Sequence, residues 1–283
     1  MRLFKTTLAI MLSLIMLQTQ AWASLKDLPM QVAEVNDVQI AWTETGDPEG
    51  VPVVLIMGLG SSHHLWGDAF VDGLVSAGYR VVLFDNRDVG GSQRFDENGQ
   101  PVIWWNLLKR KLGLPLSRAY TLYDMAADTV GLMDTLGIDR AHIVGVSMGG
   151  MIAQIIASNY SQRTRSLVSI MSTSGAPHLP EPAPEAEIKL RNLAAAETEM
   201  SVSQHERGFF PEAIPRQLMA VFDAGDRSAE LQSITATTLV LHGVDDTLLP
   251  VAHGKHTAAL ISGARFLAFE GMGHDLPVEV VPK

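Results

Sequence analysis

The stretch Ala141–Ala153, AHIVGVSMGGMIA, organises the rest of the chain. It begins with a largely apolar run, which predicts a buried strand, and the residues of 151–159 have the composition of a helix. Between them stands the pattern Gly145-x-Ser147-x-Gly149. Small residues on either side of a serine allow a sharp turn from strand into helix, which exposes the hydroxyl above the positive end of the helix. The strand and the helix make Ser147 a candidate nucleophile, since the five-residue pattern alone is common.

The segments around this turn alternate between predicted strands and predicted helices. Continuous apolar runs indicate strands that are buried on both faces, and apolar residues at helical spacing indicate the helices between them. This alternation predicts an α/β fold with a mostly parallel sheet and crossover helices. Besides the strand before Ser147, the expected strands are a hairpin within 32–45 that turns at Asn36-Asp37, then 53–57, 79–84, 167–171, 238–242 and 265–269; the expected helices are 66–77, 123–136, 151–159 and 251–261.

The composition changes after Ser172. From about 175 to 226 the chain is rich in Pro, Ala and Glu, with helical stretches near 184–199 and 215–222. The alternation of strands and helices resumes afterwards, and no internal repeat is present. We therefore expect one domain over 24–283 with a small helical insertion at about 175–226.

The composition excludes several classes of protein. Hydrophobic residues make up 47% of the 283 and charged residues 18%, which indicates a folded domain rather than a disordered chain or a coiled coil. The net charge of −10 argues against nucleic acid as a partner, because phosphates would be repelled. The chain has no cysteine, so it forms no disulfide and offers no thiol nucleophile.

Residues 1–23 have the features of a secretory signal peptide. Arg2 and Lys5 give a positive start, 8–17 is apolar, and 21–23 (AWA) places small residues at the cleavage positions. We expect export to the periplasm or the medium, with a mature chain that begins at Ser24 and is not stably inserted in the membrane. The alternative is an uncleaved anchor, but the apolar run is shorter than the ~20 residues that span a bilayer.

A serine nucleophile needs a base and an acid, which in this kind of sheet follow it in the order acid, then histidine. Asp245 and Asp246 follow the strand that ends at His242, and either could be the acid. His274 follows the last predicted strand and is the best base of the nine histidines. His242 precedes the acid, so its order is wrong for the base.

The other histidines receive other roles. His63 is expected to line the mouth of the pocket without acting as the base. His253 and His256 lie in a predicted helix, where solvated or capping roles are expected. The pair has no evident carboxylate companion, so no metal site is expected, and no cofactor either.

An acyl-transfer site also needs two N–H donors for the oxyanion. One should be the backbone of Met148, directly after the candidate nucleophile at the start of its helix. The other should come from the turn after the strand 53–57, which has the sequence Met57-Gly58-Leu59-Gly60.

Together these motifs give the chain a resemblance to α/β-hydrolases of the esterase type over nearly all of 32–281. Within them it is most similar to the aclacinomycin methylesterase group. The stretches that carry the resemblance are 85–92 (DNRDVGGS), 145–149 (GVSMG), 253–256 (HGKH) and 271–277 (GMGHDLP).

The resemblance implies specific roles. In that family the acidic aspartate stands four residues before a proline, so Pro250 selects Asp246, and the second oxyanion donor is Leu59. The loop 85–92 is expected to be a structural, ion-paired turn.

Two departures from the family carry expectations. The insertion is short, so a pocket for a large polycyclic methyl ester is not assumed. The chain ends nine residues after His274, where the family usually has a closing helix; 278–281 would begin that helix, and the rest would be missing.

The expected function is a serine carboxylesterase, with methyl esters among the possible substrates and a small-molecule ester as the only expected partner. Met57, Leu59 and Met148 would surround the ester with apolar groups, which suits uncharged acyl groups of small to medium size. Trp104 and Trp105 are expected chiefly as core residues and secondarily as a border of the pocket. The sequence predicts no oligomeric state.

Two alternatives remain. A lactonase or a perhydrolase would use the same triad with a different acyl acceptor. A binding protein with a hydrolase fold is the non-enzyme alternative, although such proteins usually lose a member of the triad and none is missing here.

Overall fold

The computed structural model describes residues 24–194 and 208–277. The predicted signal peptide, the end of the first predicted insertion helix and the predicted start of a closing helix lie outside these residues, so export and the closing helix stay predictions.

The described residues form one sheet of eight strands in the order β1-β2-β4-β3-β5-β6-β7-β8. The strands are β1 (Gln31–Val35), β2 (Val38–Gly46), β3 (Val51–Ile56), β4 (Tyr79–Phe84), β5 (Ala141–Val146), β6 (Thr164–Ile170), β7 (Thr237–Gly243) and β8 (Arg265–Phe269). The first two pairings, β1 with β2 and β2 with β4, are antiparallel, and all the others are parallel. The predicted α/β fold is therefore confirmed. The predicted hairpin turns at Asn36 and Asp37, which both have positive φ, as a tight hairpin turn requires.

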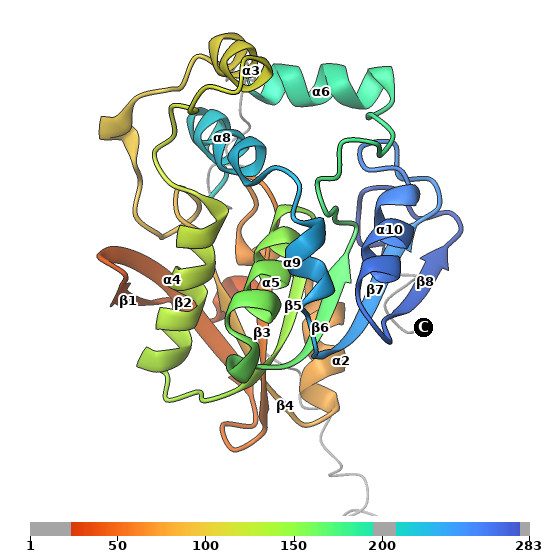
Figure 1. Cartoon of the computed structure of the whole chain (residues 1–283). Helices are drawn as coiled ribbons and strands as arrows, with labels where there is room; N and C mark the ends of the chain where they lie inside the picture. The colour runs from red at the N-terminus through yellow and green to blue at the C-terminus, as the bar shows by residue number, and fades with distance from the viewer. Residues whose placement is uncertain (1–23, 195–207, 278–283) are drawn as a thin grey trace, which may run out of the picture.

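Helices cover both faces of the sheet (Figure 1). The side chains of α4, α5 and α9 form the core on one face, and those of α2 and of the segment near Leu25 form it on the other. The helices are α2 (Asp68–Ser76), α3 (Ile103–Lys111), α4 (Leu122–Thr135), α5 (Met148–Asn159), α6 (Pro184–Ala194), α8 (Ile214–Ala224), α9 (Ser228–Gln232) and α10 (Ala252–Leu260).

A cap of three helices lies above the sheet, at the end where β5 leads into α5 (Figure 1). Helices α6 and α8 come from the predicted insertion. Helix α3 comes from an earlier part of the chain, 101–122, to which the sequence analysis assigned no element. The sequence pattern of α3 does not predict an amphipathic helix packed on the core, because its buried residue is the polar Asn106 while most of its apolar residues are exposed.

The two tryptophans of α3 correct a sequence-based expectation. Trp104 and Trp105 were expected chiefly in the core, yet they are 69% and 46% exposed. They pack edge to face against each other on the outside of the cap. The core is complete without them, since α3 covers no part of the sheet.

A buried ion pair fastens the insertion to the sheet. Arg216 of α8 donates to both carboxylate oxygens of Asp88, at 2.7 and 2.8 Å, and the two side chains are 2% and 0% exposed. The same carboxylate accepts from the Tyr120 hydroxyl and from the Phe95 N–H. The loop 85–92 is thus an ion-paired turn, as expected, and it is the point at which the cap is anchored.

Removal of Arg216 should destabilise the protein strongly. Arg216→Ala would leave the Asp88 carboxylate buried without its partner, so we expect the free energy of unfolding in urea to fall by about 3–5 kcal/mol. The matched control is Arg191→Ala, which breaks the exposed pair with Glu187 and should cost less than about 0.5 kcal/mol. Equal losses in the two variants would show that the buried pair does not anchor the cap.

Candidate active site

Ser147 occupies a strained turn between β5 and α5. Its φ of 55° and ψ of −119° lie in a region that residues with a side chain rarely adopt. Its N–H donates to the carbonyl of Ile170 at 2.9 Å, and its carbonyl accepts from the Ser172 hydroxyl at 2.8 Å. These bonds hold the turn from both sides, so the hydroxyl is fixed above the carboxyl end of the sheet.

The flanking glycines allow the turn to be this tight. A Cβ on Gly145 would lie 2.1 Å from the carbonyl oxygen of Gly149, and a Cβ on Gly149 would lie 2.1 Å from that of Ile56. Any side chain at either position would push α5 away from β3 and β5. The glycine–serine–glycine pattern is therefore a packing requirement of the site.

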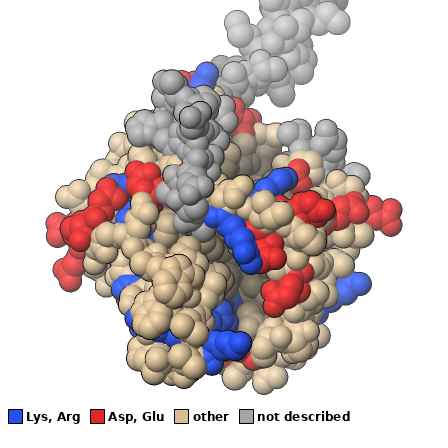
Figure 2. Space-filling view, turned by 90° about the horizontal axis from the view of Figure 1, so that it is seen from above, with Lys and Arg blue, Asp and Glu red and all other residues tan. Residues whose placement is uncertain are grey.

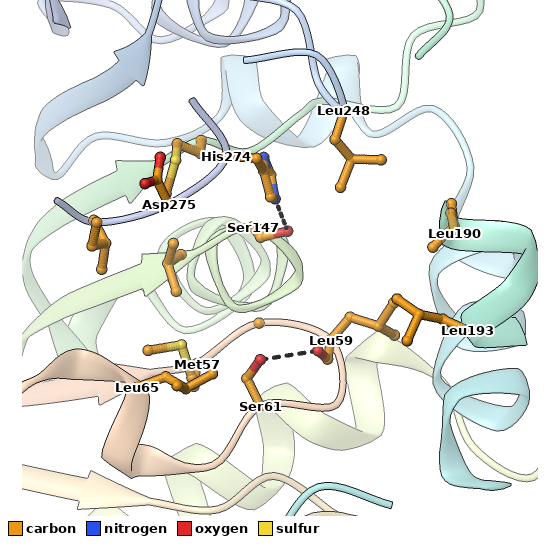
Figure 3. Close-up of a pocket in the computed structure, with 14 residues that line it drawn as sticks. Met57, Leu59, Ser61, Leu65, Ser147, Leu190, Leu193, Leu248, His274 and Asp275 are labelled. Carbon is orange, nitrogen blue, oxygen red and sulfur yellow. Dashed lines mark hydrogen bonds between the residues drawn. The ribbon is translucent and has the colours of Figure 1, made fainter. Parts of the chain in front are cut away.

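His274 connects Ser147 to Asp246. Its Nε2 lies 2.9 Å from Ser147 Oγ, and its Nδ1 lies 2.7 Å from Asp246 Oδ2 (Figure 3 draws the first contact). A carboxylate accepts only, so Nδ1 carries the proton and Nε2 is free to accept the serine proton. The arrangement can generate a nucleophilic alkoxide at Ser147.

Asp246 is held as an anion. Its Oδ1 accepts from the N–H groups of Leu248 and Leu249, at 2.9 and 2.8 Å. Burial by itself would raise the pKa of Asp246, but hydrogen bonds from His242 and His274 outweigh burial and lower the pKa below its ordinary value of 3.8. Asp245 faces elsewhere and accepts from the N–H of Gly271.

His242 is a site residue whose contact with the acid the sequence analysis did not anticipate. Its imidazole is fully buried, with Nε2 2.7 Å from the Leu249 carbonyl and 3.4 Å from Asp246 Oδ2. Because both partners are acceptors, Nε2 carries a proton, and its contacts hold the loop 246–249 in place. Its position at the end of a strand, four residues before Asp246, was the available signal.

Two other histidines differ from expectation. His63 was expected at the pocket mouth, yet it is buried, with Nδ1 2.8 Å from Asp85 Oδ1, and it does not line the cavities at Ser147. His253 was expected to be solvated or capping, yet it is buried between the Thr173 hydroxyl and the Pro180 carbonyl. Burial is also the main reason that the pKa of His253 is lowered.

The turn after β3 faces Ser147 from the other side. A Cβ on Gly58 would lie 3.2 Å from Ser147 Cβ, so this turn is in close contact with the serine. Gly60 N–H donates to Gln217 of α8 at 2.7 Å, which fixes the turn to the cap. In the part of the chain that the structure describes, the backbone N–H groups of Leu59 and Met148 have no acceptor, so both are available to an oxyanion.

Two cavities meet at Ser147. The first has a volume of about 380 Å³ and contains His274 (Figure 3). The second, of about 310 Å³, contains Met148 but not His274. Four residues line both cavities and form the boundary between them: Leu59, Ser147, Leu190 and Leu248.

The cavities also locate the predicted pocket residues. Met57 lines the first cavity, as expected. Trp104 lines only a separate groove beside α3, and Trp105 lines none of these spaces.

Neither a metal site nor a membrane span is found in the described residues. No group of three or more His, Cys, Asp or Glu side chains there could hold a metal ion. The described helices are also too short or too polar to cross a bilayer.

Comparison with known proteins identifies relatives along most of the chain. Residues 51–202 match the family model described as alpha/beta hydrolase fold. Rhodomycin D methylesterase DnrP of Streptomyces peucetius is 28% identical, with 87% of this chain and 92% of that protein covered. The 2-hydroxy-6-oxo-6-phenylhexa-2,4-dienoate hydrolase of Comamonas testosteroni is 30% identical, with coverages of 85% and 86%.

A solved structure supports the fold. A hydrolase from Pseudomonas aeruginosa PA01 superposes with a TM-score of 0.66 at 24% identity, over 87% of this chain and 91% of that one.

The depressed pKa of Asp246 predicts a pH dependence of stability. Because the folded-state pKa lies below 3.8, the unfolded chain binds this proton first as the pH falls. The ionised Asp246 carboxylate therefore stabilises the fold above about pH 4, and this contribution is lost as the pH falls through the folded-state pKa.

Denaturant unfolding at about pH 6 and about pH 3 tests this dependence. The wild type should lose more free energy of unfolding between these values than Asp246→Asn does. Asp27→Asn, which removes an exposed carboxylate, is the control for the loss of one charge. Equal losses in wild type and Asp246→Asn would contradict the argument.

Proposed function

We propose that this chain works through an acyl-enzyme formed at Ser147. The chain belongs to the alpha/beta hydrolase fold family and is a carboxylic ester hydrolase. The observation that carries the proposal is the hydrogen-bonded series from Ser147 through His274 to the anionic Asp246, next to two unpaired N–H groups.

In the first half of the reaction Ser147 Oγ attacks the ester carbonyl while His274 Nε2 takes its proton. The anionic Asp246 stabilises the imidazolium that forms. The carbonyl oxygen becomes an oxyanion, which accepts from the N–H groups of Leu59 and Met148. The imidazolium then gives its proton to the alcohol oxygen, and the C–O bond breaks.

In the second half a water molecule takes the place of the alcohol. His274 removes a proton from the water as it attacks the acyl carbon, and the same two N–H groups bind the second oxyanion. Collapse releases the carboxylic acid and returns the proton to Ser147.

The two cavities divide the substrate between them. The leaving oxygen must reach His274 Nε2, so the alcohol part belongs in the first cavity, where that side chain lies. The acyl part then extends past Met148 into the second cavity. The ester group then lies at Ser147, which lines both cavities.

The linings indicate the chemistry of each part. Ser61 and Asp275 are the polar residues of the first cavity besides Ser147 and His274, so it suits an apolar alcohol larger than methanol. The second cavity is also largely apolar but includes Arg110, Glu181 and Thr173, so it tolerates an acyl group with polar substituents.

Two other ester classes remain as candidates. A methyl ester is favoured by the similarity to rhodomycin D methylesterase, although it would leave most of the first cavity empty. A lactone, whose acyl and alcohol parts are joined in one ring, would use the same residues.

Turnover of p-nitrophenyl acetate tests the nucleophile. Ser147→Ala should lower kcat by at least about a thousandfold, because the remaining groups only bind and polarise the ester. An organophosphate should add its phosphoryl group to Ser147 of the wild type. Ser61→Ala, the control, removes another cavity hydroxyl and should keep that labelling; a folded Ser147→Ala with the wild-type rate would sink the mechanism.

Cavity-filling variants test the division of the substrate. Leu65→Trp narrows only the first cavity and should lower kcat/KM for hexyl acetate about tenfold, with methyl hexanoate less affected. Val221→Trp narrows only the second and should show the converse preference. The reversed pattern would exchange the two assignments, and equal effects on both esters would refute the division.

A further inference from the structure

Helix α3 presents an apolar surface at the top of the molecule. Of its residues and those just after it, Trp104, Trp105, Leu107, Leu108, Leu112 and Leu114 are 40–69% exposed. Figure 2 looks down on this end of the molecule and shows broad uncharged areas, with both basic and acidic residues around them.

The apolar face of α3 is directed away from the protein. Residues at helical spacing, Trp104, Leu108 and Leu112, form an outward stripe, whereas Asn106 on the other side is buried. Asn106 Oδ1 accepts from the N–H of Ser117, and its side-chain amide donates to the Val102 carbonyl. A helix in water normally places its apolar side inward, so α3 is turned the opposite way.

The segment that carries this stripe is basic. Residues 98–123 include Lys109, Arg110, Lys111 and Arg118 and no Asp or Glu, in a chain whose net charge is −10; of these, Arg118 is paired with Asp223 of α8. Lys109 lies 6.0 Å from the centre of the Trp105 ring. Exposed Trp and Leu side by side with Lys and Arg match the interface of an anionic bilayer.

We propose that α3 and the turn after it, 102–114, form a peripheral binding surface for anionic lipid bilayers. The helix has nine residues and cannot span a bilayer, so it lies in the plane of the interface. The apolar stripe enters the boundary between headgroups and acyl chains, while Lys109 and Lys111 remain with the anionic headgroups.

A second copy of the chain fits this surface less well. In a symmetric dimer the same patch meets itself, so Lys109 and Lys111 of one copy would face those of the other. The segment 98–123 offers no carboxylate to compensate that repulsion. An anionic lipid surface supplies the opposite charge.

The surface adjoins the route to Ser147. A groove beside α3, of about 630 Å³, shares Leu190, Leu218 and Phe222 with the second cavity. Arg110 of α3 also lines that cavity. An ester drawn from the bilayer could therefore reach Ser147 through the acyl cavity; this substrate source rests on the proposed function, whereas the docking itself does not.

The tryptophans provide a direct test in the full-length chain. Trp42 and Trp66 are buried, and Trp22→Phe removes the tryptophan of the predicted signal peptide, so Trp104 and Trp105 become the exposed reporters. Vesicles of phosphatidylglycerol and phosphatidylcholine with brominated acyl chains quench tryptophans that enter the bilayer. We expect quenching that weakens as salt is added.

Variants in the same background identify the surface. Leu108→Gln/Leu112→Gln should weaken the quenching titration more than about tenfold. Lys111→Gln should weaken it about fivefold, as expected for one basic residue near an anionic surface. Val32→Gln changes an apolar residue of β1 that is about as exposed as Leu112; it is the matched control and should leave the titration unchanged.

Three outcomes would overturn the docking surface. One is vesicle binding without quenching, which would place contact elsewhere, for example at residues 1–23. Another is equal loss in Val32→Gln and in the α3 double variant. The third is a dimer in solution that the double variant disrupts, in the absence of quenching.

Activity separates this proposal from the mechanism. The double variant should keep wild-type turnover of soluble p-nitrophenyl acetate and lose most turnover of a long-chain ester embedded in the vesicles. Equal vesicle activity would overturn the bilayer as substrate source. Ser147→Ala should still show full quenching, because docking does not need the nucleophile. A wild type that is quenched but inactive would refute the mechanism and not the docking surface.

Discussion

The close approach of β5, β3 and α5 at the Ser147 turn is the constraint on which the site depends. Gly145 and Gly149 bring backbone to backbone at distances that exclude any Cβ, and the positive φ of Ser147 is the consequence. The strain is held by hydrogen bonds to β6 and to Ser172, so the sheet maintains it. The exposed hydroxyl, the free N–H of Met148 and the contact with Gly58 all follow from this one turn.

Electrostatics of the acid loop give the turn its chemistry. Asp246 is buried, which alone would favour its neutral form, yet four hydrogen-bond donors surround it: two backbone N–H groups and the imidazoles of His242 and His274. The anion that results fixes the tautomer of His274 and so leaves Nε2 facing Ser147. His242, which no order-based rule would select, connects the end of β7 to this loop.

The cap lines both cavities that meet at Ser147, through residues of α6 and α8. It is assembled from two parts of the chain, because α3 precedes Ser147 and α6 and α8 follow it. The buried Arg216–Asp88 pair fastens α8 to the loop after β4, and Gln217 on the same helix fixes the turn after β3 through Gly60. The stability of the cap and the geometry of the proposed oxyanion site thus depend on one helix. The outer surface of α3 places an apolar, basic patch beside the same cavities.

Local pattern in the sequence determined the alternation of strands and helices, the turn at Ser147 and the chain order of Asp246 and His274. Each of these depends on neighbouring residues and on the periods of strands and helices. Chain order alone left Asp245 and Asp246 open, and only the resemblance, through Pro250, selected Asp246; the tertiary structure shows that Asp246 contacts His274 while Asp245 accepts from Gly271. Only the tertiary structure decided the positions of His63 and His253, which were expected near solvent and are buried by segments far away in the sequence. Helix α3 was not predicted, because its exposed apolar residues reverse the pattern that identifies a helix. Burial is a property of the assembled chain, and no local pattern records it.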